Sequence, residues 1–176
     1  MRRLAVLLLL AGCSVVDEPY PARWDPLPPT LPADCLRFQG TYADRGESPA
    51  KEPKPSLTRE LFGAQSPWEK AVSVEFAFGE QALDIRVAAP GANAFSRRLA
   101  ASSGEFACEG GKLVVRNRRW VTSDLMSGRE IVKIEMYQAD PQLVARVDET
   151  TTGLMFMVVP LSGESVKWYR FPRLKP

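Results

Sequence analysis

Alternation of apolar and polar residues marks most of the chain as β-structure. In residues 72–78, valine and phenylalanine at every second position alternate with Ser73, Glu75 and Ala77, and residues 83–87 repeat the pattern after Gly79-Glu80. A period of two places one set of side chains on a buried face of a strand and the other on a wet face. These two segments therefore predict an antiparallel hairpin.

The rest of the chain gives similar runs, separated by Gly, Ser and Pro turns. Leu57–Phe62 is expected to be a short helix, because Ser56 can cap its start and Gly63 can end it. Many short strands favour closure or strong curling, which removes exposed edges. The sequence thus predicts an all-β fold: an antiparallel meander that forms a small barrel or curled sheet. The further expected strands are 38–43, 95–101, 105–108, 112–121, 131–138, 143–151, 154–161 and 166–171.

Residues 154–159 are the strongest apolar run beyond the start of the chain, and both faces of that strand would be apolar. A strand of this kind is expected to be covered on both sides, here as a central strand beneath the helix. Two alternatives remain. Met155, Phe156 and Met157 would line a barrel interior that holds an apolar ligand, or the run would form a partner interface.

The chain begins with Arg2 and Arg3, followed by an apolar run over residues 4–11. The run is about half the length of roughly 20 residues that a membrane-spanning helix needs. Its layout is typical of an export signal. Leu10-Ala11-Gly12-Cys13 resembles the lipobox of bacterial lipoproteins. This resemblance implies cleavage before Cys13, a diacylglycerol on its thiol and an acyl chain such as palmitate on its amino group.

The same resemblance suggests where the protein resides. Ser14 follows the cysteine where an aspartate would favour the inner membrane, so the outer membrane of the cell envelope is implied, with the domain facing the periplasm. An ordinary cleaved signal with an incidental cysteine is the alternative. The expected organisation is a signal peptide at residues 1–12, a lipidated cysteine with a proline-rich tether at 13–34, and a β domain at 35–176.

The tether contains six prolines, each of which fixes φ and lacks an amide donor. It is expected to be extended polyproline II rather than helix or strand, and it would hold the domain about 60 Å from its lipid. A Pro29-x-x-Pro32 ligand for a proline-binding domain is the alternative.

Removal of the signal changes the charge of the protein. Without Arg2 and Arg3, the 23 basic residues fall to 21, equal to the 21 acidic residues, and the formal net charge of +2 falls to zero. A neutral domain is a poor nonspecific binder of nucleic acid, which needs many phosphate contacts. The expected partners are a membrane, through the lipid, and an envelope protein or lipid.

The cysteines divide in the same way. With Cys13 assigned to the lipid, Cys35 and Cys108 form an even pair in an oxidising compartment. We expect a disulfide between them, which would stabilise the fold by roughly 4 kcal/mol in the chain-entropy description. Two buried free thiols are the alternative.

The chain contains no histidine. This excludes Ser-His-Asp and Cys-His catalysis and the usual zinc sites, and no cofactor fingerprint or calcium loop is present. Ser48-x-x-Lys51 has the spacing of a Ser-Lys dyad but lacks the two further motifs that such enzymes need. We therefore expect no enzyme, no metal and no cofactor. The function favoured is noncatalytic binding or interaction in the cell envelope, and the alternative is a lipocalin-like carrier of a small hydrophobic ligand.

Three arginines beside a tryptophan form the main candidate surface site: Arg116, Arg118, Arg119 and Trp120. They would contact an anionic partner such as lipid headgroups. The alternative is a charged outer face that protects a sheet edge.

Two further resemblances concern the domain. Gly40-x-Tyr42 in the first strand and Arg170 near the chain's end resemble the Gly-x-Trp and covering arginine of lipocalins, with Tyr42 in place of tryptophan and without a clear Thr-Asp-Tyr motif. The order of Cys35, Gly40-x-Tyr42, Gly46-Glu47, Leu61-Phe62-Gly63, a later cysteine and Trp168-Tyr169-Arg170-Phe171 resembles small uncharacterised lipoproteins of proteobacteria. The first resemblance implies lipocalin-like topology, and the second implies no particular activity.

Overall fold

A computed structural model of the chain describes residues 14–29, 35–50, 54–63, 70–91, 94–123, 126–156 and 158–174. The expected signal peptide, the expected lipidation site Cys13, part of the proline-rich segment and Met157 lie outside the described residues.

The described residues form an all-β fold with one short helix, as the alternation predicts. The predicted hairpin is present, and the predicted helix has its predicted bounds, with Ser56 as N-cap and Gly63 at its end. The elements in chain order are β1 (Ser14–Asp17), η1 (Cys35–Phe38), β2 (Gly40–Ala43), α1 (Leu57–Phe62), β3 (Ser73–Phe78), β4 (Ala82–Ala88), β5 (Phe95–Ala100), β6 (Phe106–Glu109), β7 (Lys112–Thr122), β8 (Met126–Ala139), β9 (Gln142–Met155) and β10 (Val159–Pro172).

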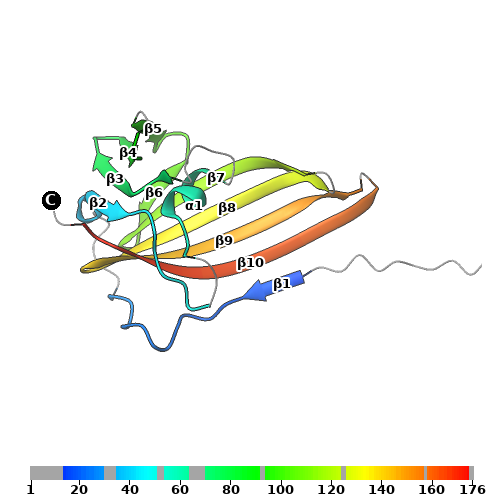
Figure 1. The fold of residues 1–176 in the computed structure, drawn as a ribbon, viewed down its shortest axis with the longest axis horizontal. Coiled ribbons are helices and arrows are strands. Elements are labelled where there is room, and N and C mark those ends of the chain that lie inside the picture. The colour runs from blue at the N-terminus through cyan, green and yellow to red at the C-terminus, as the bar shows by residue number, and fades with distance from the viewer. Residues whose placement is uncertain are drawn as a thin grey trace, which may run out of the picture.

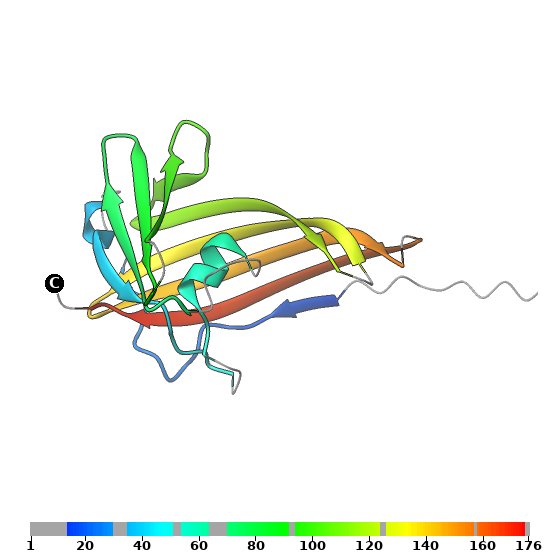
Figure 2. The ribbon, with the colours of Figure 1, turned by 45° about the horizontal axis from the view of Figure 1, so that its top comes forward.

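The strands form two sheets. The large sheet has the order β1-β10-β9-β8-β7-β6, and the small sheet has the order β2-β3-β4-β5. Neighbours pair antiparallel, except that β1 runs parallel to β10. Figure 1 shows β7 to β10 as one long curved sheet, with the small sheet across one end. In Figure 2, α1 lies over the middle of the concave face. The curled sheet is therefore correct, and within the described residues the strands do not close into a barrel.

The space between the two sheets is filled by large side chains. The alternation explains this core, because the inward residues of the small sheet meet inward residues of the large sheet at one end: the first half of β7, the second half of β8, the first half of β9 and the second half of β10. Fully buried members include Phe38, Tyr42, Phe76, Leu113, Met136 and Phe171.

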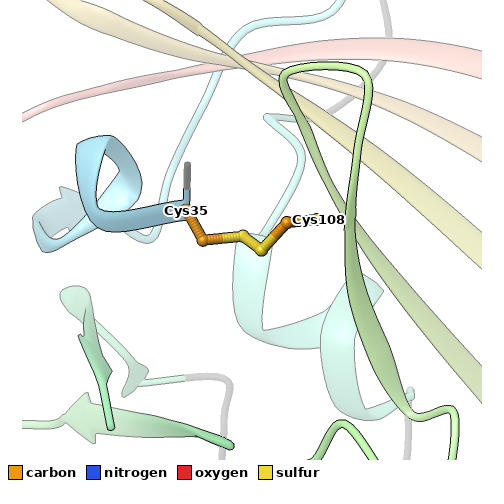
Figure 3. The surroundings of a disulfide bond; sticks show 2 residues. All are labelled: Cys35 and Cys108. Atoms are coloured by element: carbon orange, nitrogen blue, oxygen red, sulfur yellow. A yellow bond between two sulfur atoms is a disulfide. The ribbon is translucent and has the colours of Figure 1, made fainter. Parts of the chain in front are cut away.

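The disulfide between Cys35 and Cys108 is present, with the two Cα atoms 5.8 Å apart. Cys35 begins η1, which leads directly into β2 of the small sheet, whereas Cys108 lies on β6 at the edge of the large sheet. Figure 3 shows the bridge between these two elements. It links the two sheets covalently across 73 positions of sequence.

The described part of the proline-rich segment is not a free tether. The expectation that it contains no strand is wrong, because β1 pairs with Gly163–Val166 of β10. Trp24 is buried beside Val144 and Trp168 on the outer face of the large sheet, with Tyr20 and Leu27 packed around them. The indole N–H of Trp168 donates to the Glu18 carbonyl at 2.9 Å. The prolines thus separate apolar residues that hold the segment against the domain.

The expectation for residues 154–161 is also wrong. Gly153 is not a turn, because β9 continues through it to Met155 and β10 begins at Val159. The Leu154–Val159 run is therefore the hairpin end of the long sheet rather than a covered central strand. Leu154, Phe156 and Val158 are 45%, 59% and 76% exposed. We call these three residues the apolar tip.

The chain's end reaches back to β2, with a different arginine from the one expected. Arg170 forms an ion pair with Glu47 at 2.5 Å and lies over the Trp24 ring. Arg173 instead covers Tyr42, and a Cβ atom on Gly40 would come within 3.0 Å of its guanidinium. The predicted contact between an arginine near the chain's end and Tyr42 of β2 is therefore present, but Arg173 makes it instead of Arg170.

Candidate functional site

A cavity of about 660 Å³ lies between α1 and the concave face of the large sheet. We call it the α1 cavity. Its floor includes Arg119, Glu130, Glu149 and Lys167 from four adjacent strands, and its walls include side chains of α1 and of the residues that precede it. The volume lies within the range of about 300–1,000 Å³ that is usual for small-molecule sites.

Hydrogen bonds to buried polar groups fix α1 over this cavity. Asp44, fully buried just after β2, accepts hydrogen bonds from Ser56 Oγ at 3.1 Å, from the Thr58 amide at 2.9 Å and from the Thr58 hydroxyl. At the other end, Asn117 of β7 donates from Nδ2 to the Leu61 carbonyl at 2.5 Å. Both ends of a helix this short are thus held by the sheets rather than by its own propensity.

Strand register assembles the charged floor. Arg119 of β7 lies directly opposite Glu130 of β8, and Glu149 of β9 lies opposite Ser165 of β10 on the same face. Arg119 forms an ion pair through Nε with Glu130 and another, at 3.6 Å, from Nη2 to Glu149. Glu149 also accepts from Ser165 Oγ at 3.1 Å and lies 3.5 Å from Lys167 Nζ. The four charges of the floor therefore balance one another.

Glu60 of α1 adds a carboxyl above this floor. Burial, reinforced by the charge of Glu149, raises the pKa of Glu60 from 4.5 to about 7, although Lys167, Arg119 and Arg59 act in the opposite direction. The charge of the α1 cavity thus changes near neutral pH. A carboxyl with this pKa accepts or donates a proton at a bound group, but the site holds no histidine or free thiol to act with it.

The rim of the cavity is cationic and partly aromatic. Lys54 and Arg59 are exposed and make no ion pair with any residue that the structure describes. Phe62 and Tyr169 supply aromatic surface beside them. This arrangement suits a ligand with an anionic group and a flat apolar part.

The predicted basic patch is divided by the pleat of β7. Arg119 points to the concave face, where it belongs to the floor, whereas Arg116 and Arg118 lie on the outer face. Arg116 pairs with Glu109 at 2.8 Å. Trp120, 68% exposed, follows the same alternation to the outer face near the end of the strand. The four residues therefore do not form one surface.

The predicted apolar-ligand lining is not found. Met155 is half-buried and Phe156 is exposed at the apolar tip, outside the filled core. In the part of the chain that the structure describes, no group of three or more metal-ligating side chains is present, and no helix is both long and apolar enough to span a bilayer.

No local sequence motif marks Glu60, Glu130, Glu149 or Lys167 as site residues. Glu149 lies near the end of the strand predicted at residues 143–151, yet β9 continues six residues beyond it and most of its side chain is buried. The available signal was the change from apolar to charged inward positions along each long strand, such as Val115, Asn117 and Arg119 of β7. The inward charged residues can be recognised as one site only when the register of the four strands is known.

Comparison of the chain with protein-family models, with curated protein sequences and with solved structures found no match.

Proposed function

We propose that this chain is a lipid-anchored cell-envelope protein with a noncatalytic binding role, and that the α1 cavity is its binding site. The observation that carries the proposal is the contrast between the floor and the rim. The floor charges are paired with one another, so they stiffen the site, while Lys54 and Arg59 remain available to an anionic ligand. The ligand class that fits is a small amphiphilic anion with an aromatic or otherwise flat apolar part.

The anchor is proposed from the sequence. The Leu10-Ala11-Gly12-Cys13 resemblance supports a lipid on Cys13, and Ser14 after it favours the outer membrane, with the domain in the periplasm. The mass of the mature N-terminal peptide, from protein made in a Gram-negative host, tests this part. We expect a peptide that begins at Cys13 and carries diacylglycerol and one further acyl chain. A peptide without lipid would contradict the anchor.

The filled core favours this binding role over a lipocalin-like carrier. The fully buried side chains of Phe38, Tyr42 and Met136 occupy the space where an apolar ligand would lie. The aromatic residues of the α1 cavity still offer surface to part of a lipid. Native mass spectrometry of the protein extracted from envelopes in mild detergent distinguishes the two, since a co-purified neutral lipid would favour the carrier.

The α1 cavity is tested with 8-anilinonaphthalene-1-sulfonate, a fluorescent probe with an anionic group on a flat apolar ring system. We expect one saturable site on the folded protein, and Arg59→Gln should weaken binding about tenfold, as the loss of one charge-assisted contact does. Arg86→Gln is the matched control, because Arg86 is an exposed arginine of the small sheet. Equal affinity of the two variants would contradict the assignment of the site. Near-ultraviolet circular dichroism verifies that each variant is folded.

A further inference from the structure

We propose that the apolar tip, Leu154, Phe156 and Val158, inserts into the surface of the bilayer that holds the lipid on Cys13. The inference rests on the proposed function for the lipid anchor, and it adds a second membrane contact made by the folded domain itself. The occupant of this exposed apolar surface is thus the interfacial region of a phospholipid bilayer.

The first observation is the backbone of the turn between β9 and β10. Phe156 has a φ of 53°, in the left-handed region that favours glycine or asparagine. A large apolar residue here gives the turn no conformational advantage, and more than half of its surface is exposed to solvent. The side chain therefore does not serve the turn or the core. A partner outside the protein explains its presence.

The second observation is where the anchor leaves the fold. Ser14, the residue after Cys13, lies beside Gly163 of β10. Gly163 is four residues from Val159, where β10 begins next to the tip, which is about 13 Å along a strand. Because β1 and β10 run parallel, the start of β1 faces the hairpin end of the sheet, as Figure 1 shows. Acyl chains on Cys13 would enter a bilayer at the same end as Phe156.

The third observation is a cationic and aromatic belt behind the tip. Trp120 lies opposite Arg129 on the outer face of β7 and β8, and Arg118 is on the same face. Neither arginine makes an ion pair with a residue of the described ranges. Arg129 also lies opposite Thr152, two residues before Leu154. A tryptophan and two free arginines at this depth match the headgroup region of a bilayer whose acyl layer receives the tip.

The test measures the depth of single positions in the lipidated, full-length mature protein. Val158→Cys supplies a free thiol at the tip for a bimane label, since Cys35 and Cys108 are bonded to each other. Ser102→Cys is the control, at an exposed turn between β5 and β6, on the side of the molecule where β6 pairs with the first residues of β7. Both proteins are reconstituted into vesicles of phosphatidylethanolamine and phosphatidylglycerol, with or without brominated acyl chains.

We expect brominated lipid to quench most of the fluorescence at position 158 and to leave position 102 unchanged. Phe156→Asp in the Val158→Cys background should abolish the quenching. Val72→Asp should preserve the quenching, because Val72 is a similarly exposed apolar residue that lies just before β3 of the small sheet. A lipidated protein whose label at position 158 stays as bright as the label at 102 overturns the tip contact and leaves the anchor intact.

The mass of the N-terminal peptide keeps the two proposals separate. A chain without lipid overturns the anchor, and the tip is then tested alone with Val158→Cys in a Cys13→Ser background, because an unlipidated Cys13 would itself take the label. Quenching at position 158 would still support the tip contact, and its absence would overturn it.

Discussion

The guanidinium of Arg173 lies 5.9 Å from the centroid of the Tyr42 ring, and its Nη2 atom donates to the Gln39 carbonyl at 2.5 Å. Beneath this cover, the Tyr42 hydroxyl lies 3.0 Å from the Phe38 carbonyl and 2.9 Å from Gln138 Oε1. The end of the chain thus closes over a tyrosine that joins β2 of the small sheet to β8 of the large one. Burial raises the pKa of Tyr42 to about 12, so its hydroxyl stays a donor at neutral pH.

Loss of the Tyr42 hydroxyl should therefore destabilise the interface of the sheets. Tyr42→Phe leaves two buried acceptors without this donor, and we expect the free energy of unfolding to fall by about 1–3 kcal/mol. Tyr20→Phe is the matched control, because the Tyr20 hydroxyl donates to the Asp25 carbonyl at the surface. Urea unfolding curves provide the comparison. Equal midpoints for the two variants would show that the hydroxyl adds nothing to the core.

Glu60 should make stability fall as pH rises toward neutrality. The pKa of Glu60 is about 7 in the folded protein and takes its ordinary value of 4.5 in the unfolded chain. Between pH 4.5 and 7 the folded chain therefore holds a proton that the unfolded chain has released. Stability from this group is complete below pH 4.5 and is lost as pH rises to about 7, by at most about 3 kcal/mol. Glu60→Gln should abolish this decline, while Glu80→Gln, at an exposed turn, should retain it.

The pH range of the stability measurement must exclude acidic pH, because another carboxyl, Glu135, changes stability in the opposite direction there. Burial disfavours the charge of Glu135, but hydrogen bonds from Lys133 and Lys112 hold its pKa at about 2. Its contribution is complete above pH 4.5 and is lost as pH falls toward 2. Thermal unfolding between pH 4.5 and 8 therefore avoids the loss from Glu135, and the difference in slope between the wild type and Glu60→Gln reports Glu60, because burial also raises the pKa of Asp148 in both proteins. An identical slope in the wild type and Glu60→Gln would refute the role of this residue.

Removal of the disulfide should weaken the link between the sheets. The paired variant Cys35→Ala with Cys108→Ala frees a loop of 73 positions, and we expect a loss of roughly 4 kcal/mol. Reductant should lower the unfolding midpoint of the wild type and leave that of the variant unchanged. A count of free thiols in the unreduced, denatured protein checks the bond directly, and two reactive thiols at these positions would disprove it.

Trp24 should decide whether residues 14–29 stay on the domain. Trp24→Ala removes the buried centre of the contact with Val144 and Trp168, so we expect amide protons of this segment to exchange much faster while those of β8 and β9 keep their protection. Trp120→Ala changes an exposed tryptophan and should leave the exchange of the segment unaltered. Rapid exchange of residues 14–18 in the wild type would mean that β1 is not stably paired.

The alternating strands were predictable because alternation is a local property. Neighbouring residues determine the β3–β4 hairpin and the helix with Ser56 and Gly63 at its ends. The Cys35–Cys108 bond was predictable because the chain contains only three cysteines. The hairpin end at Phe156 was missed because an apolar residue in a left-handed turn gives the opposite of the usual signal. The docking of the proline-rich segment was missed because Tyr20, Trp24 and Leu27 are spaced among prolines, which favour neither a regular helix nor a strand.

The candidate site depended on information of a different kind. Arg119 and Glu130 are neighbours only because β7 and β8 pair in one register, and a shift by one residue would place them on opposite faces. Glu60 joins them through Asp44 and Asn117, which are distant in sequence and hold the two ends of α1. No local pattern encodes these distances, so charge pairing across four strands could be identified only in the folded chain.

The parallel pairing of β1 with β10 also protects an edge of the large sheet from pairing with another copy of this protein. Without β1, the backbone amides and carbonyls of Gly163–Val166 would form an open edge, which is a template for strand addition by another chain. β1 occupies that edge within its own molecule. Proteolytic loss of β1 would thus leave a sheet edge able to accept a strand from another copy of the protein.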